Sequence, residues 1–135
     1  MAAPFLDTNI LLRHLLQDDP DQSPRATAYL RRIEQGEVQV CISDIVVFET
    51  VFTLQRQYRR AKAEIAQHLL PLLELPGILL PGKRRFRRVF NLYVSLNLPF
   101  ADAYHAALME QLKLSEIATF DTDFDRVPGV HRIEP

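Results

Sequence analysis

Residues 3–9 read APFLDTN, a short apolar segment that ends at an acid and two further polar residues. We predict a strand over residues 3–6, with Asp7 directly after it and an apolar helix over residues 10–16. The same alternation continues along the chain, where short apolar runs are separated by longer amphipathic ones. This pattern is typical of an α/β domain whose parallel strands are connected by helices.

The other elements follow from the same periodicities. Four further strands are expected at residues 38–42, 77–80, 116–120 and 130–133. Helices are expected at residues 24–35, 44–58, 62–75, 86–94 and 101–112. Ser23 and Ser43 are suitable N-caps for two of them. The prediction is one α/β domain over residues 1–135, with a central, mostly parallel, five-stranded sheet.

The composition indicates a domain that folds without cross-links. The chain has 135 residues and one cysteine, Cys41, so an internal disulfide is impossible. We see no zinc-type cysteine and histidine spacing, no signal-peptide core and no membrane-spanning apolar run, and we therefore expect a cytoplasmic protein outside the membrane. The net charge of −1, from 16 basic and 17 acidic residues, does not by itself indicate a nucleic-acid partner.

Three acids fall where strands end or helices begin. Asp7 and Asp121 directly follow the first and fourth expected strands, and Asp102 lies in the first turn of the helix before the fourth strand. Parallel strands share one carboxyl edge, where such folds bind ligands, so we expect these carboxylates to be neighbours. Each also has a structural interpretation: a helix cap for Asp7, a helix-dipole contact for Asp102 and a turn for Asp121.

Glu49 is a fourth acid, within the apolar stretch IVVFETVF of residues 45–52. A helix that is apolar on nearly every side is expected to be buried, and a buried carboxylate needs a compensating charge. Either a bound divalent cation or a salt bridge to an arginine would supply that charge. The joint placement of the four acids favours the cation.

Four motifs occur in order along nearly the whole chain. They are FLDTN at residues 5–9, Ser43 followed by Glu49 in an apolar helix, ADAYHAA at residues 101–107 and TFDTDF at residues 119–124. As an ordered set they resemble the PIN domain and, within it, the VapC toxins of bacterial toxin–antitoxin pairs.

The resemblance implies a three-layer α/β/α sandwich with an acidic pocket. The pocket would contain Asp7, Glu49, Asp102 and Asp121, with Asp123 as a candidate fifth member. Three further side chains would hold waters or carboxylates in place: Thr8, Asn9 and Thr119. The chain departs from the family pattern at Pro4, which shortens the first strand, and at Asp125, an additional acid that competes with Asp123 for the fifth place.

This set of ligands suits Mg²⁺ or Mn²⁺, which are hard cations that prefer oxygen donors. Such an ion would acidify a water, align it with a phosphodiester and neutralise charge on the leaving oxygen. The predicted activity is that of a divalent-metal-dependent endoribonuclease. The resemblance adds products with a 5′-phosphate and a 3′-hydroxyl, a small antitoxin partner and a homodimer.

A basic run is the candidate RNA-binding surface. It consists of Lys83, Arg84, Arg85, Arg87 and Arg88. Cations at a helix N-terminus are opposed by the helix dipole, so helix stability does not explain this run. Contact with RNA phosphates is the functional interpretation, and a solvated helix face is the structural one.

Two other classes of function stay open. A catalytically silent RNA-binding or scaffold PIN domain would keep the fold without the reaction. A phosphoacceptor α/β domain would carry phosphate on Asp7. Two observations argue against this last class. A phosphatase of the dehalogenase type needs a second Asp two residues after the first, and the chain has Asn9 there. A receiver domain needs an acidic pair before the phosphorylated Asp and a lysine late in the chain, and neither occurs.

Overall fold

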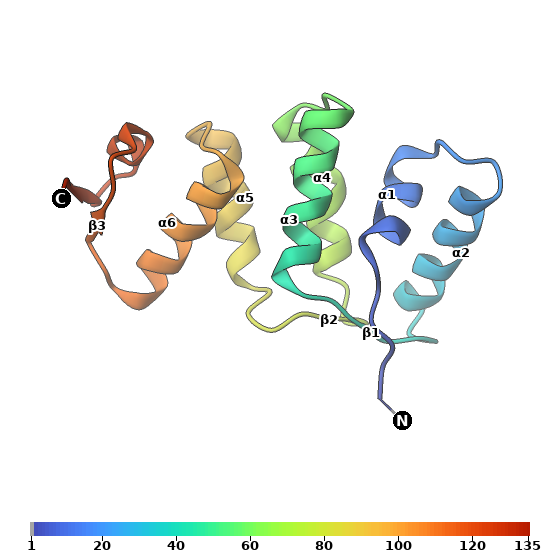
Figure 1. Ribbon diagram of the computed structural model, residues 1–135. Helices are drawn as coiled ribbons and strands as arrows, with labels where there is room; N and C mark the ends of the chain where they lie inside the picture. Colours follow the sequence, from blue (N-terminus) through green and yellow to red (C-terminus); the bar gives the residue numbers. More distant parts are fainter. Residues whose placement is uncertain (1) are drawn as a thin grey trace. The chain divides into compact units, whose positions relative to one another are not determined.

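The computed structural model describes residues 2–135. The chain divides into two compact units, of which the first ends at Lys83 and the second runs from Arg84 to Pro135. Each unit has its own helices (Figure 1). Each unit also has its own parallel strand pairing.

Three extended segments pair in parallel in the first unit. The strand β1 (Val40–Cys41) is hydrogen-bonded on one side to β2 (Ile78–Leu79) and on the other to residues 4–6. The amide of Cys41, for example, donates to the carbonyl of Pro4 at 2.8 Å. All three segments lie where the sequence predicted strands, although each is shorter than expected.

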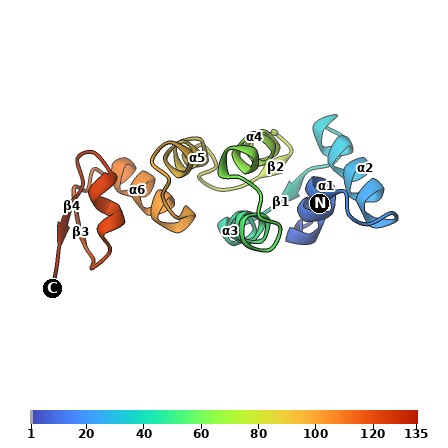
Figure 2. The ribbon, with the colours of Figure 1, turned by 90° about the horizontal axis from the view of Figure 1, so that it is seen from above.

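Four α-helices accompany these strands: α1 (Thr8–Leu16), α2 (Gln22–Glu34), α3 (Asp44–Phe52) and α4 (Lys62–Leu73). Helix α1 packs against both α2 and α3, and Figure 2 shows α1 and α2 side by side from above. Helix α3 continues as a π-helix, η1 (Thr53–Gln57), in which the Tyr58 amide donates to the carbonyl five residues earlier. The predicted helix at 44–58 is therefore confirmed in extent, but its last turns are wound differently.

The two predicted N-caps have different outcomes. The Ser43 side chain accepts a hydrogen bond from an amide in the first turn of α3, as predicted. Ser23 is buried inside α2 and does not cap it. Instead, Oδ1 of Asp19 accepts from the amides of Gln22 at 2.6 Å and Asp21 at 2.9 Å, and these bonds hold the pKa of Asp19 below its ordinary value.

Gly77 precedes β2 at a position where a side chain has no room. A methyl group there would lie 2.7 Å from Cγ2 of Ile33, 3.0 Å from the Ile33 carbonyl oxygen and 3.1 Å from the Val38 carbonyl oxygen. Two of these are backbone atoms, which cannot move without disturbing α2 and the approach to β1. We expect Gly77→Ala to lower the free energy of unfolding by about 1–3 kcal/mol, measured by urea denaturation. An unchanged unfolding midpoint would contradict this close packing.

The second unit contains two long helices and one strand pair. Its elements are α5 (Arg85–Ser95), α6 (Phe100–Leu112), β3 (Glu116–Ala118), the short 3-10 helix η2 (Thr122–Arg126) and β4 (His131–Ile133). The strands β3 and β4 pair in parallel, at the two places where the sequence predicted strands. The 3-10 helix between them was not expected.

Four aromatic rings fill the interface between α5 and α6. Phe86, Phe90 and Tyr93 on α5 and Phe100 on α6 are each at most 2% exposed. The ring centroid of Phe100 lies 5.1 Å from that of Phe90 and 5.2 Å from that of Tyr93. Burial raises the pKa of Tyr93 to about 12. This packing fixes the start of α6, the turn that carries Asp102.

The structure confirms an α/β fold with parallel strand pairing. A central five-stranded sheet is not confirmed, because the strands are two or three residues long and pair as one set in each unit. No helix within residues 2–135 has both the length and the apolar character needed to cross a membrane.

Candidate metal centre

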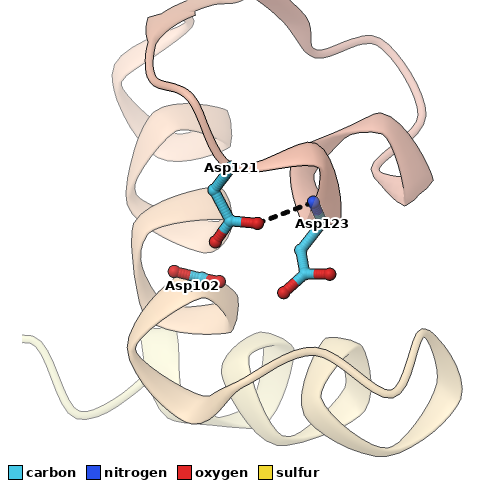
Figure 3. A group of neighbouring side chains, drawn as sticks. All are labelled: Asp102, Asp121 and Asp123. Atoms are coloured by element: carbon cyan, nitrogen blue, oxygen red, sulfur yellow. Dashed lines mark hydrogen bonds between the residues drawn. The ribbon is translucent and has the colours of Figure 1, made fainter.

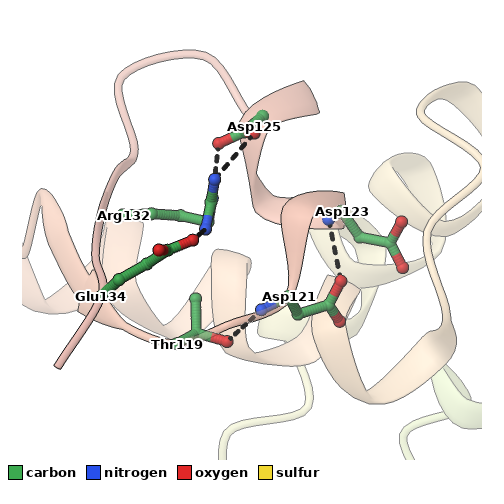
Figure 4. A network of polar contacts seen from close by, with 6 residues as sticks. All are labelled: Thr119, Asp121, Asp123, Asp125, Arg132 and Glu134. Atoms are coloured by element: carbon green, nitrogen blue, oxygen red, sulfur yellow. Dashed lines mark hydrogen bonds and ion pairs between the residues drawn. The ribbon is translucent and has the colours of Figure 1, made fainter.

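The turn after β3 presents two carboxylates. The Asp121 amide donates to the Thr119 hydroxyl at 3.0 Å, and the Asp123 amide donates to Oδ1 of Asp121 at 2.8 Å (Figure 4). The second of these bonds caps η2. The two bonds fix the backbone from which both carboxylates project.

Asp102 joins these carboxylates from the first turn of α6. One oxygen from each of Asp102, Asp121 and Asp123 lies within 4.8 Å of the other two (Figure 3). Asp121 is exposed, whereas the other two are half-buried. The second unit thus brings three of the acids that the sequence indicated into one cluster.

Burial and the neighbouring carboxylates raise the pKa of Asp102 above its ordinary value. Burial is the largest cause, followed by the charge of Asp121, a hydrogen bond with the Asp121 side chain and the charge of Asp123. His105, in the same helix, acts in the opposite direction. A cation shared among the oxygens would relieve the repulsion. Three carboxylates without a sulfur or imidazole donor fit Mg²⁺ or Mn²⁺.

Asp125, the additional acid of the sequence, is held outside this cluster. Arg132 on β4 donates to both oxygens of Asp125, at 2.8 and 3.3 Å, and to Glu134 at 2.7 Å (Figure 4). Asp123 also has a cationic neighbour, since a nitrogen of Arg126 lies 3.2 Å from its Oδ1. Even so, the structure places Asp123, and not Asp125, with the other two carboxylates.

Asp7 and Glu49 lie in the first unit. Asp7 directly precedes α1, and its side chain accepts no capping hydrogen bond from that helix, so the helix-cap interpretation is not supported. Thr8 is buried, and its hydroxyl donates to Oε2 of Glu49 at 3.1 Å. This bond ties the start of α1 to the middle of α3. Asn9 is exposed on α1.

The expected burial of Glu49 is wrong. Glu49 is exposed, and Ile45, one turn earlier on α3, is 64% exposed. Only the sides of α3 that carry Val46, Val47 and Val51 are buried. A helix side is buried only where another element packs against it, whatever residues the side carries. The apolar sequence of α3 therefore led to an overestimate of how much of the helix is buried. The need for a compensating charge at this position therefore disappears.

A comparison with models of protein families matches the PIN domain over residues 5–130. The chain belongs to the PIN domain family. No curated protein sequence matches it significantly. PIN domains are commonly nucleases that act on RNA, and they typically bind divalent metals. Membership therefore indicates a nuclease-type function, and the matched region includes Asp7 and Glu49 as well as the three-carboxylate cluster.

The first cation of the basic run has a structural role in this PIN domain. Nζ of Lys83 donates to the carbonyls of Leu75 at 2.8 Å and Ile78 at 2.9 Å, and burial lowers its pKa. Arg84 and Arg87 are exposed near the start of α5. Arg88 is exposed as well, so the accessible charges of the run belong to these arginines rather than to the lysine.

Two further arginines of the run lie against α6. Arg85 donates to Gln111 at 2.8 Å and to the Tyr104 hydroxyl at 2.9 Å, with its guanidinium 5.5 Å from the Tyr104 ring centroid. Arg88 pairs with Glu110 at 2.9 Å. These contacts join α5 to α6. They give two of the cations at this helix start a structural role.

Sequence reasoning missed the cations around the cluster. Arg126 follows Asp123 at the i+3 spacing of a short helix, which is a detectable pattern once η2 is expected. The contact of Arg132 with Asp125 depends on the loop that brings β4 beside β3, and residue spacing alone does not indicate it.

The raised pKa of Asp102 leads to a stability prediction for the metal-free PIN domain. The folded state binds a proton at Asp102 more readily than the unfolded state, so the resulting stabilisation is present at low pH and is lost as pH rises through the raised pKa. Asp102→Asn should therefore raise the melting temperature at pH 7 in EDTA. This gain should vanish below the ordinary value of 3.8. Glu116→Gln, at an exposed acid on β3, is the control, and equal stability of wild type and Asp102→Asn at pH 7 would contradict the prediction.

Proposed function

We propose that this PIN domain is an endoribonuclease that hydrolyses RNA phosphodiesters with Mg²⁺ or Mn²⁺ as its cofactor. The observation that carries the proposal is the group of oxygens from Asp102, Asp121 and Asp123 within 4.8 Å of one another. Ions of this kind are bound through a few carboxylates and otherwise keep water or phosphate oxygens as ligands. A cluster of acids in a nuclease family is therefore best explained as a cation site.

The proposed catalytic residues are Asp7, Glu49, Asp102 and Asp121, with Asp123 as a further metal ligand. When bound, the ion would supply charge neutralisation at the phosphate and increased acidity of a water. Thr119 holds the turn that carries Asp121, and Thr8 holds Glu49 through its hydroxyl. In the proposal, Asn9 orients water or substrate beside Asp7.

The direct test is RNA cleavage by the purified full chain. RNA should be cut in Mg²⁺ or Mn²⁺, should stay intact in EDTA, and should carry 5′-phosphate ends after cutting. RNA that is bound but never cut would instead indicate a silent RNA-binding domain, and stable phosphorylation of Asp7 would indicate a phosphoacceptor. Cleavage that persists in EDTA would also contradict the proposal.

In this proposal RNA phosphates contact the basic run, chiefly through Arg84 and Arg87. Replacing both with Gln should weaken binding of single-stranded RNA and reduce the salt dependence of log K by roughly 0.7 for each phosphate that is no longer bound. Fluorescence anisotropy in EDTA measures this binding without cleavage. Arg31→Gln with Lys113→Gln removes the same charge from two exposed positions outside the basic run and serves as the control. An equal loss of affinity in both double variants would leave the basic run without a specific role.

We further propose that the biological role is that of a VapBC-type toxin. The support is the ordered set of four motifs, which resembles the VapC toxins. The role implies a small antitoxin partner, a homodimer in the cytoplasm and a single nuclease domain over residues 1–135 with a five-stranded sheet in a three-layer sandwich. Expression should arrest growth, and co-expression of a short neighbouring reading frame should relieve the arrest. Arrest that persists with Asp121→Asn would contradict a toxin that acts by cleavage.

A further inference from the structure

A cavity of about 540 Å³ lies between α1 and α2 in the first unit. It is lined by Asn9, Ile10 and Arg13 from α1 and by Gln22, Arg25, Ala26 and Tyr29 from α2. Its volume falls within the range of roughly 300–1,000 Å³ that is usual for sites that bind small molecules. A single nucleotide is a ligand of that size.

The side chains around this cavity match the chemistry of a nucleobase. Tyr29 offers a half-buried aromatic ring, and Asn9 and Gln22 offer two exposed amides, each with both donors and an acceptor. Within residues 2–135, neither amide side chain has a hydrogen-bond partner. Single-stranded RNA is recognised by stacking of bases on aromatic rings and by hydrogen bonds to base edges. The cavity presents both kinds of group.

The charges at the cavity favour a base over a phosphate. Arg13 donates to both oxygens of Asp18, each at 3.0 Å, and Arg25 pairs with Asp21 at 3.1 Å. Each guanidinium is therefore balanced by a carboxylate, and the rim carries little net positive charge.

Asn9 links the cavity to two of the proposed catalytic residues. Asn9 is two residues after Asp7 and directly follows Thr8, whose hydroxyl binds Glu49. These positions fall within one helical turn, which is about 5.4 Å of rise. A base held between α1 and α2 would therefore leave its sugar and phosphate beside Asp7 and Glu49.

We propose that the cavity between α1 and α2 is a base-specificity subsite, which binds one unstacked nucleobase of the RNA next to the phosphate that is cut. This inference rests on the proposed nuclease function. Tyr29 stacks on the base, and Asn9 and Gln22 bind its edge.

The first experiment sequences the 5′ ends that the full chain produces from a randomised RNA in Mg²⁺. Wild type should prefer one base at a position next to the cut. Gln22→Ala and Tyr29→Leu should reduce that preference about tenfold while cleavage continues. Gln35→Ala, an exposed glutamine at the other end of α2, is the matched control and should keep the preference. An unchanged preference in both cavity variants overturns the subsite and leaves the nuclease function standing.

A second experiment does not depend on cleavage. An oligouridine that contains 4-thiouridine is irradiated with the full chain in EDTA, and the cross-linked peptide is identified by mass spectrometry. Cross-links should map to the peptide that contains Tyr29, and Gln22→Ala should reduce their yield. Cross-links found only elsewhere overturn the subsite and assign the cavity to another class of ligand, such as a side chain of a protein partner. Absence of cleavage together with cross-links at Tyr29 would overturn the nuclease function alone.

Discussion

Asp121→Asn is expected to lower RNA cleavage roughly 10²–10³-fold, as is usual when a group that stabilises developing charge is removed. The substitution removes one negative charge from the three-carboxylate cluster and changes almost nothing else. The Asn side chain keeps an oxygen that can accept from the Asp123 amide, a bond of 2.8 Å in the native chain. The turn after β3 should therefore survive, and single-turnover cleavage in Mg²⁺ measures the effect on the reaction.

The matched control for this variant is Asp125→Asn. The two positions lie in the same five-residue stretch, but Asp125 is bound by Arg132 and lies outside the cluster. Its replacement should cost little stability, because exposed ion pairs contribute little, and should leave cleavage nearly unchanged. Equal loss of cleavage in both variants would show that the cluster has no specific role and that cleavage depends on the total negative charge of this stretch. Full activity of Asp121→Asn would remove this residue from the proposed site.

Phe100→Ala should have the largest effect on stability, with a loss of about 3–5 kcal/mol in the free energy of unfolding. Phe100 is 1% exposed, and its ring stacks on Phe86 with an interplanar angle of 11° in addition to its contacts with Phe90 and Tyr93. Removing the ring leaves a cavity among aromatic groups that cannot collapse to fill it. Urea denaturation followed by circular dichroism measures the change.

Phe100→Leu separates the effect of side-chain volume from the effect of aromatic packing. It should cost less than the alanine variant, because a smaller cavity remains. Since Phe100 lies two residues before Asp102, the alanine variant should also weaken Mn²⁺ binding beyond the effect of unfolding. Wild-type stability of Phe100→Ala would contradict the packing described between α5 and α6.

Local patterns in the sequence predicted the positions of the elements well. The five extended segments and six α-helices lie close to the expected residues because the periodicity of apolar residues and the cap at Ser43 act within a few residues of each other. Features that depend on a neighbour were missed. Asp19, and not Ser23, binds the amides at the start of α2, and its position depends on the turn before that helix. The strands were predicted too long, since pairing partners determine where a strand ends.

The same distinction holds for the candidate site. The spacing of the motifs indicated Asp102, Asp121 and Asp123, which the second unit brings together. Glu49 is exposed, and Asp125 is bound by Arg132. Both features depend on which elements pack beside these residues, so the sequence contains no local signal for either. Lys83 shows the same limit, because its role depends on the carbonyl of Leu75, after α4, and on that of Ile78 in β2.

The central claim is that Asp102, Asp121 and Asp123 bind one divalent ion together. Titration of the metal-free chain with Mn²⁺, followed by electron paramagnetic resonance, tests this claim most directly. Asp102→Asn and Asp121→Asn should each weaken Mn²⁺ binding. The loss in the double variant should be smaller than the sum of the two single losses, because both residues serve one ion. Wild-type Mn²⁺ affinity in Asp121→Asn would contradict the claim.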